Sequence, residues 1–280
     1  LFDKNNIITS DEKGNVIVFS VNQNKEITKF NFYKKQHKKI SKVLNLAIEN
    51  SVIYISDNLG YLYAFNYNIN KLLWAKNYKI PFRSNIKITK NKIILANQNN
   101  SLFFIDKKNG EILRSVPTEE SIIKNNFINN LAVFKNNVIF LNTYGSLYSI
   151  NIKSMRINWF INLNQSLNAD RSRSFTSSQL IISSNRIFVP TNNNFYILNF
   201  TTGEINYKKN FTSFLKPLVV GDILYTVSNN LLIATAYETG KIIFSYDINQ
   251  KIAEYLSTKK RKVELKSLMF LENKIFIFLK

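Results

Sequence analysis

Residues able to catalyse a reaction or bind a metal are few in this chain. The 280 residues include one histidine, His37, and no cysteine, which excludes a His-rich metal site, thiolate chemistry and disulfide bonds. Asp57 and Asp106 fall in or beside predicted turns, where an aspartate commonly binds backbone amides. No glycine-rich phosphate loop, metal-ligand spacing or Ser-His-Asp set occurs. We therefore predict no catalytic residue, no cofactor site, no metal site and no enzymatic activity.

Positive charge is the other feature with chemical consequences. The formal net charge is +20, which would attract phosphates or an anionic membrane surface. Two basic runs contribute to it: Lys34, Lys35, Lys38 and Lys39 in the first, and Lys259, Lys260, Arg261 and Lys262 in the second. The sequence holds 42 Asn, 37 Ile and 31 Lys but only 7 Gly and 4 Pro, a bias that AT-rich codons would produce without selection for an anionic partner. We interpret both runs as solvated loops. The more specific alternative is that they contact anionic lipid.

The elements that would position these residues form an internal repeat. Six segments, each with short apolar runs that alternate with period two, align on one position at intervals of 37 to 48 residues. The aligned residues are Phe19, Phe65, Ile105, Ile150, Leu198 and Thr235. An apolar run before each of the later units makes four short strands per repeat, which is typical of a β-propeller blade. Turns such as Asn109-Gly110 and Thr202-Gly203 fall where a hairpin needs a positive φ.

The predicted fold is therefore an all-β propeller of four-stranded antiparallel blades, with six readable blades and part of a seventh. The expected blades are residues 1–34, 42–79, 85–117, 128–164, 175–211, 214–248 and, in part, 266–280. Residues 249–265 form an inter-blade insertion, in which Ile252, Ala253, Tyr255 and Leu256 have a spacing compatible with a helix. We expect the chain to be a fragment or a processed form of a propeller with seven or eight blades.

Residues 52–74 resemble a known family of repeats. An apolar strand, then Asp57-Asn58-Leu59-Gly60, then Tyr-Leu-Tyr-Ala-Phe and a terminal Trp74 are similar to the PQQ-like repeat. That repeat occurs in quinoprotein dehydrogenases and in bacterial BamB-type lipoproteins of the outer-membrane β-barrel assembly machinery. The resemblance implies that the terminal aromatic of each blade packs between blades as a structural residue; here these are Trp74, Trp159, Tyr207 and Phe244. The alternative WD repeat is disfavoured, because its Gly-His and Trp-Asp pairs are missing.

The resemblance to BamB-type proteins implies a non-catalytic interaction scaffold in the periplasm, associated with the outer membrane and monomeric within a complex. Those proteins dock the barrel-assembly protein through an exposed inter-blade loop with leucine and arginine residues. The matching positions here are Arg83, Leu167, Arg171 and Arg173. A solvated loop is the competing interpretation of the cluster around Asp170.

Two further function classes stay open. The first is a fragment of a quinoprotein dehydrogenase, whose family would use PQQ, Ca²⁺, a general-base aspartate and often a vicinal disulfide. The chain has no cysteine, and its two tryptophans are at structural repeat positions. The second is a basic propeller that binds nucleic acid or anionic surfaces. Such a surface needs stacking aromatics beside its charges, and only Tyr33 and Tyr255 flank the basic runs, so no specific nucleic acid is expected.

Overall fold

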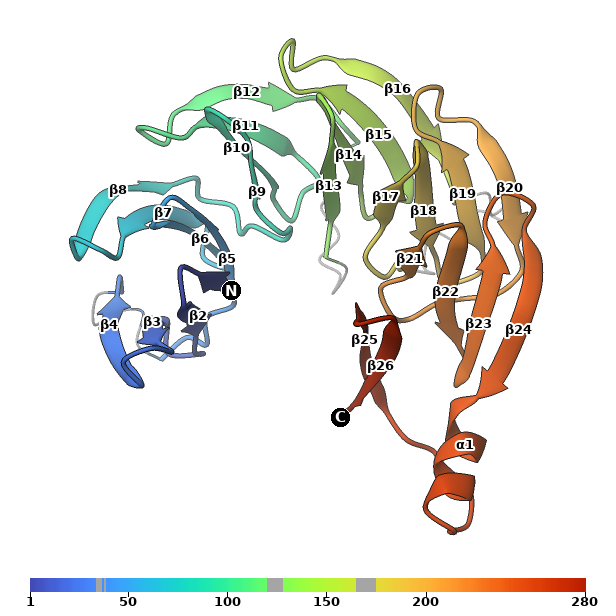
Figure 1. The fold of residues 1–280 in the computed structure, drawn as a ribbon. Helices are drawn as coiled ribbons and strands as arrows, with labels where there is room; N and C mark the ends of the chain where they lie inside the picture. Colours follow the sequence, from blue (N-terminus) through green and yellow to red (C-terminus); the bar gives the residue numbers. More distant parts are fainter. Residues whose placement is uncertain (34–36, 38, 120–127, 165–174) are drawn as a thin grey trace. The chain divides into compact units, whose positions relative to one another are not determined.

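A computed structural model of the chain describes residues 1–33, 37, 39–119, 128–164 and 175–280 (Figure 1). The described residues form six four-stranded sheets and one two-stranded sheet, each joining strands that follow one another in the chain. The predicted fold class, an all-β propeller built from four-stranded antiparallel blades, is confirmed. The chain divides into two compact units: residues 1–143 with 150–158, and residues 144–149 with 159–280.

The first unit contains three complete sheets. The first sheet is β1 (Phe2–Asp3), β2 (Asn6–Ser10), β3 (Asn15–Ser20) and β4 (Lys25–Asn31). The second is β5 (Leu44–Glu49), β6 (Val52–Asp57), β7 (Tyr61–Asn66) and β8 (Lys71–Asn77). The third is β9 (Lys87–Ile88), β10 (Lys92–Ala96), β11 (Leu102–Asp106) and β12 (Ile112–Val116). The fourth sheet, whose residues are divided between the units, is β13 (Asn130–Phe134), β14 (Asn137–Leu141), β15 (Ser146–Asn151) and β16 (Ile157–Asn162).

The second unit contains the remaining sheets. The fifth sheet is β17 (Ile181–Ser183), β18 (Arg186–Pro190), β19 (Phe195–Asn199) and β20 (Ile205–Lys209). The sixth is β21 (Leu218–Val220), β22 (Ile223–Ser228), β23 (Leu231–Ala236) and β24 (Lys241–Asp247). The two-stranded sheet is β25 (Leu265–Leu271) and β26 (Lys274–Leu279). The helix α1 (Ile248–Tyr255) lies between β24 and β25 and overlaps residues 249–265, where the sequence spacing allows a helix. No helix of the described residues is both long enough and apolar enough to cross a membrane.

Burial differs between the strands of one sheet. In the second sheet, β6 and β7 are buried almost throughout, which explains why both read as nearly continuous apolar runs, whereas β2 and β3 of the first sheet are only partly buried. The fourth strand is mostly exposed, and in β8 only Trp74 is half-buried. The apolar cores therefore form where strands of neighbouring sheets meet. One such cluster in the first unit joins Ile53, Ile55 and Phe65 of the second sheet to Val16 and Val18 of the first.

The terminal aromatics of the outer strands dock on glycines of the following sheet. Trp74 donates its indole N–H to the carbonyl of Lys107 at 3.1 Å, and a Cβ atom on Gly110 would lie 2.8 Å from its ring. In the second unit, Trp159 donates to the carbonyl of Phe200 at 3.2 Å and lies against Gly203 in the same way. The glycines adopt φ values of +73° and +78°, so they serve both the turn and the close approach of the ring.

Tyr207 repeats this arrangement, because its hydroxyl donates to the carbonyl of Tyr237 and its ring lies 3.1 Å from a Cβ atom placed on Gly240. The positions equivalent to Trp74 in the first and third sheets are Thr28 and Arg114, opposite Val18 and Phe104. The turns that follow in the next sheets then carry Asn70 and Met155, at φ values of +49° and +56°. At this turn, glycine thus stands where a ring needs the space.

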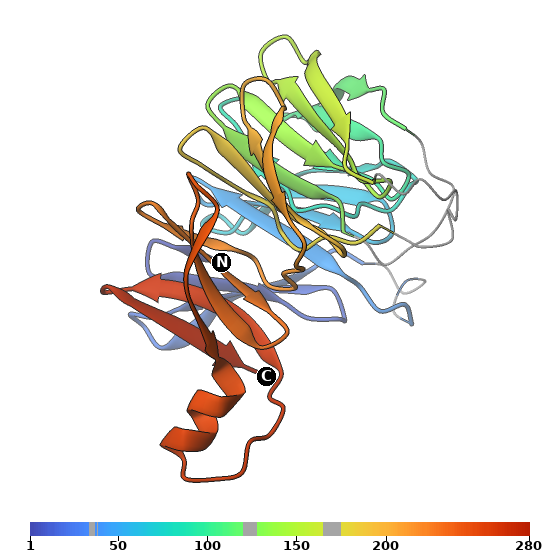
Figure 2. The same ribbon diagram turned by 90° about the vertical axis from the view of Figure 1, so that its right-hand side faces the viewer.

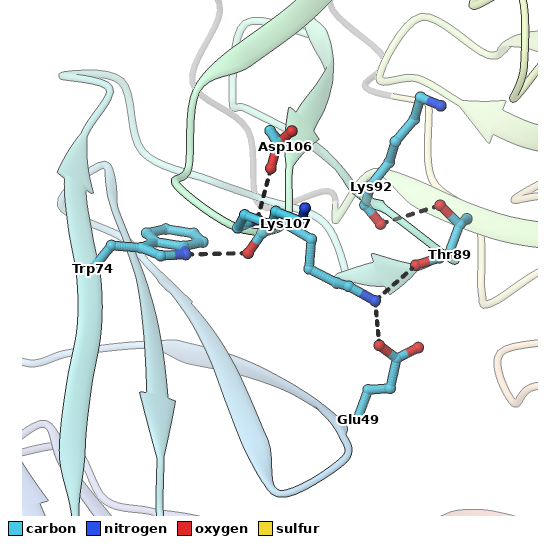
Figure 3. A network of polar contacts seen from close by, with 7 residues as sticks. Glu49, Trp74, Thr89, Lys92, Asp106 and Lys107 are labelled. Carbon is cyan, nitrogen blue, oxygen red and sulfur yellow. Dashed lines mark hydrogen bonds and ion pairs between the residues drawn. The ribbon is translucent and has the colours of Figure 1, made fainter.

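Polar contacts also tie neighbouring sheets together in the first unit (Figure 3). The ammonium of Lys107 forms an ion pair with Glu49 of β5 and donates to the carbonyl of Thr89 at 3.3 Å. The backbone carbonyl of Lys107 is also the acceptor for Trp74. Lys107 therefore connects the third sheet to the outer strand and to the first strand of the second sheet.

Candidate interaction surfaces

The outer strands expose apolar side chains at a repeated irregularity. In β8, Leu72 pairs with Phe65 and Trp74 pairs with Ala64, so that Leu73 has no residue opposite it and forms a β-bulge. The same register shift leaves out Ile27 in β4, Leu113 in β12, Asn206 in β20 and Ile243 in β24. The four apolar bulge residues have exposed fractions of 40% for Ile27, 44% for Leu73, 43% for Leu113 and 51% for Ile243.

These bulges lie on open edges. Strands β4, β8, β12 and β24 are each the last strand of their sheet, and no further strand pairs with them among the described residues. Edge strands present unpaired backbone N–H and C=O groups, and bulges commonly interrupt them and redirect their side chains. The apolar residue before the bulge is exposed too in three of these strands, as Leu72, Ile112 and Ile242. Each edge therefore offers backbone hydrogen-bonding groups and a small apolar patch to an extended partner segment.

The second unit carries an apolar groove beside α1. Its volume is about 460 Å³, and its lining comes from β23, β24, α1 and β26. Leu232, Ile252 and Ile277 form its apolar wall, and Tyr255, Leu256 and Lys251 stand at the helix side. In Figures 1 and 2, α1 and the loop after it extend beyond the strands β21–β24 and β25–β26 of the same unit.

Of the four arginine and leucine residues predicted to contact the partner, the structure describes only Arg83. Arg83 is half-buried in the segment before β9, where its amide donates to the carbonyl of Ala96 at 3.0 Å and its carbonyl accepts from the amide of Asn129 at 2.8 Å. Leu167, Arg171 and Arg173 lie outside the described residues. Whether the four residues share a surface therefore stays a prediction.

The basic runs are also described in part. Lys39 is exposed and lines a shallow hollow of about 400 Å³ with Asp11, Glu12 and Lys13, whereas Lys34, Lys35 and Lys38 lie outside the described residues. Lys259, Lys260, Arg261 and Lys262 are all exposed in the loop after α1.

Phe244, the last of the predicted structural aromatics, is half-buried in β24 with its ring 6.3 Å from that of Tyr225 and 4.8 Å from that of Tyr246.

Asp57 is the most strongly buried carboxylate described. It accepts hydrogen bonds from the amides of Leu59 at 2.9 Å and Tyr61 at 2.7 Å, and from the hydroxyl of Tyr33 at 2.6 Å. Burial raises its pKa, and these hydrogen bonds partly offset that effect. Asn97 binds the amides of Asn99 and Ser101 through one oxygen at the same place in the third sheet. The arrangement therefore fits a repeated turn, and Asp106 likewise binds the amide of Lys108 at 2.7 Å. The described residues contain no group of three or more His, Cys, Asp or Glu side chains that could hold a metal ion.

Sequence reasoning missed two of these features, the exposed bulges and the Glu49–Lys107 ion pair. The bulges have a signal, since an apolar pair directly after a turn, such as Leu72-Leu73, breaks the period-two alternation of a strand. The ion pair joins residues 58 positions apart and has no local signal.

Comparison with known proteins agrees with this geometry. A sequence model of the family described as outer membrane protein assembly factor BamB matches residues 12–246. Among solved structures, BamB from Moraxella catarrhalis matches with a TM-score of 0.78 and 12% identity, covering 98% of this chain and 80% of that chain. The computationally designed protein Ika8 matches with a TM-score of 0.73 and 14% identity, covering 99% of this chain and 78% of that one. No curated protein sequence matches.

Proposed function

The chain belongs to the family described as outer membrane protein assembly factor BamB, and on that basis we propose that it is a non-catalytic scaffold assisting the assembly of outer-membrane β-barrel proteins. It would work in the periplasm at the outer membrane, as a monomer within a complex. Its partner would be the barrel-assembly protein of that membrane. The fold likeness to BamB from Moraxella catarrhalis is in keeping with this proposal.

The observation that supports a binding function most directly is the apolar bulge on successive outer strands. Ile27, Leu73 and Leu113 repeat it on three sheets of the first unit, each on an open edge. An extended segment that lies along such an edge would hydrogen-bond to its backbone and cover the apolar side chain. Full burial of one such side chain contributes about 1.5–3 kcal/mol; because these side chains are 40–44% exposed, covering one adds about 0.6–1.3 kcal/mol, and three together add about 2–4 kcal/mol.

The test is capture of the purified periplasmic part of the barrel-assembly protein by the immobilised chain. The variant Ile27→Ser, Leu73→Ser, Leu113→Ser should bind at least tenfold more weakly, since it removes three apolar contacts and leaves the edges intact. Asn206→Ser is the matched control, because the fifth sheet already carries a polar residue at the bulge. Equal affinity of the triple variant and the parent would show that the bulges are not part of the binding surface.

The predicted arginine contacts are tested separately. Substituting Arg171→Glu and Arg173→Glu together should weaken the same capture, and Arg83→Glu should add to the loss. Unchanged binding of both variants would show that the arginines do not contact this partner.

A second assay addresses the non-catalytic part of the proposal. The chain is incubated with PQQ and Ca²⁺, and the expected result is neither a bound-quinone spectrum nor alcohol-dependent reduction of a dye. Observing both would overturn the scaffold proposal in favour of a quinoprotein oxidoreductase.

A further inference from the structure

The end of α1 exposes two large side chains that the fold does not cover. The helix begins after Asp247, whose carboxylate accepts from the amide of Gln250 at 3.0 Å. Ile248 and Ile252 turn towards the unit and join the cluster around Val227 and Leu232. Tyr255 and Leu256, at the other end of the helix, are left 89% and 58% exposed. An exposed aromatic next to an exposed leucine is costly in water unless another surface covers them.

A cluster of cations follows these two residues. Lys259, Lys260, Arg261 and Lys262 are exposed within seven positions of Tyr255. The nearby acids are already engaged, since Asp247 pairs with Lys260 at 2.5 Å and Glu254 pairs with Lys251 at 2.9 Å. In the part of the chain that the structure describes, Lys259, Arg261 and Lys262 form no ion pair. Three positive charges therefore stand uncompensated beside an apolar tip.

We propose that this tip, residues 255–262, binds an anionic lipid surface. Tyr255 and Leu256 enter the boundary between headgroups and acyl chains, where tyrosine is favoured because its ring is apolar and its hydroxyl is polar. Lys259, Arg261 and Lys262 contact the lipid phosphates. Each basic residue near an anionic membrane strengthens binding roughly fivefold, so the three together account for a factor on the order of a hundred.

The surroundings of the tip favour lipid over a protein segment. The groove next to Tyr255 and Leu256 continues along Ile252, Ile277 and Leu279, and its lining is almost wholly apolar. An acyl chain needs only such a wall, whereas a peptide brings backbone groups that require hydrogen-bond partners. Of the basic side chains, Lys251 lines this groove, and Lys259, Arg261 and Lys262 follow Tyr255 and Leu256 in the exposed loop after the helix. This inference uses residues outside the bulges assigned to the protein partner, so either can fail without the other.

The experiment is flotation of the full chain with vesicles of phosphatidylcholine alone or mixed with phosphatidylglycerol. The parent should bind the mixed vesicles and lose binding as salt is raised. The variant Lys259→Ser, Arg261→Ser, Lys262→Ser should lose affinity on the order of a hundredfold. Its matched control is Lys71→Ser, Lys108→Ser, Lys153→Ser, which removes the same charge from exposed positions of the first unit and should bind at least tenfold more tightly than the tip variant.

The apolar part is tested with Tyr255→Ser, Leu256→Ser against the control Val43→Ser, Ile69→Ser, which removes two exposed apolar residues elsewhere. Only the tip pair should reduce flotation, and its residual binding should stay salt-dependent. Circular dichroism establishes that each variant is folded. Equal loss in the tip variant and its control, for the charge pair or for the apolar pair, would mean that binding does not depend on the tip and would overturn the proposal. Unchanged flotation of the tip variants, together with loss of capture of the barrel-assembly protein, would assign the tip to a protein and overturn it too.

Discussion

The contact between Trp74 and Gly110 makes a quantitative prediction about how neighbouring sheets are held together. Gly110 has a φ of +73°, and a Cβ atom there would lie 2.8 Å from Cε3 and Cζ3 of Trp74. Gly110→Ala therefore has two costs. The left-handed backbone costs an alanine about 1–2 kcal/mol, and forcing the ring aside adds about 1–3 kcal/mol of overpacking. We expect the free energy of unfolding to fall by about 2–5 kcal/mol.

Gly221 separates the two costs. Its φ is +55°, and nothing lies within 4 Å of a Cβ atom placed on it. Gly221→Ala should therefore show the backbone cost alone, about 1–2 kcal/mol. The overpacking component should vanish when the ring is removed, so Gly110→Ala in a Trp74→Ala background should also cost only about 1–2 kcal/mol.

The measurement is urea unfolding by circular dichroism for the parent, the three single variants and the Trp74→Ala, Gly110→Ala double variant. Emission of Trp74 in a Trp159→Phe background reports whether the ring moves. A coupling of about 1–3 kcal/mol between positions 74 and 110 is expected, with the double variant more stable than the sum of the single losses predicts. A coupling of zero, or equal losses for Gly110→Ala and Gly221→Ala, would refute the docking argument.

Three further outcomes follow from the same structure. Burial raises the pKa of Asp57 in the fold, so the stability that this group contributes is complete below its unfolded pKa and is lost as the pH rises through its folded pKa. Asp57→Asn, which copies Asn97, should make this loss smaller. The measurement is the urea midpoint of unfolding at pH values above 3.8. The Lys260 hydrogen bond lowers the pKa of Asp247, so α1 should loosen as the pH falls through that lowered pKa, and Asp247→Ala should speed proteolysis within residues 248–262 at neutral pH. Met155 holds a φ of +56° with no aromatic at Arg114 to require glycine, so Met155→Gly should raise the unfolding free energy by about 0.5–1 kcal/mol; a loss would contradict this account of the turn.

The elements with local signals were predictable. The strand pattern and the glycines at 110, 203 and 240 predicted the blades and their turns. Both signals are local, because a period of two and a glycine at a turn can be recognised in a few consecutive residues. The ion pair of Lys107 with Glu49 depends on two sheets being neighbours, which the local pattern does not encode. The burial of Asp57 could not be predicted for a related reason: Tyr33, which covers it, comes from the preceding repeat.

The aromatic residues packed between sheets and the exposed bulge residues differ in how strictly the fold determines them. An aromatic at the end of one blade occurs with a glycine in the next, as Trp74 does with Gly110, because the two fill one space. The bulge residues obey no such constraint: Asn206 occupies in the fifth sheet the place of Leu73 in the second, with the same register shift. Packing therefore leaves the bulge side chain unspecified. The apolar residues Ile27, Leu73, Leu113 and Ile243 are therefore not dictated by packing within the fold, which is in keeping with the proposal that a partner covers them.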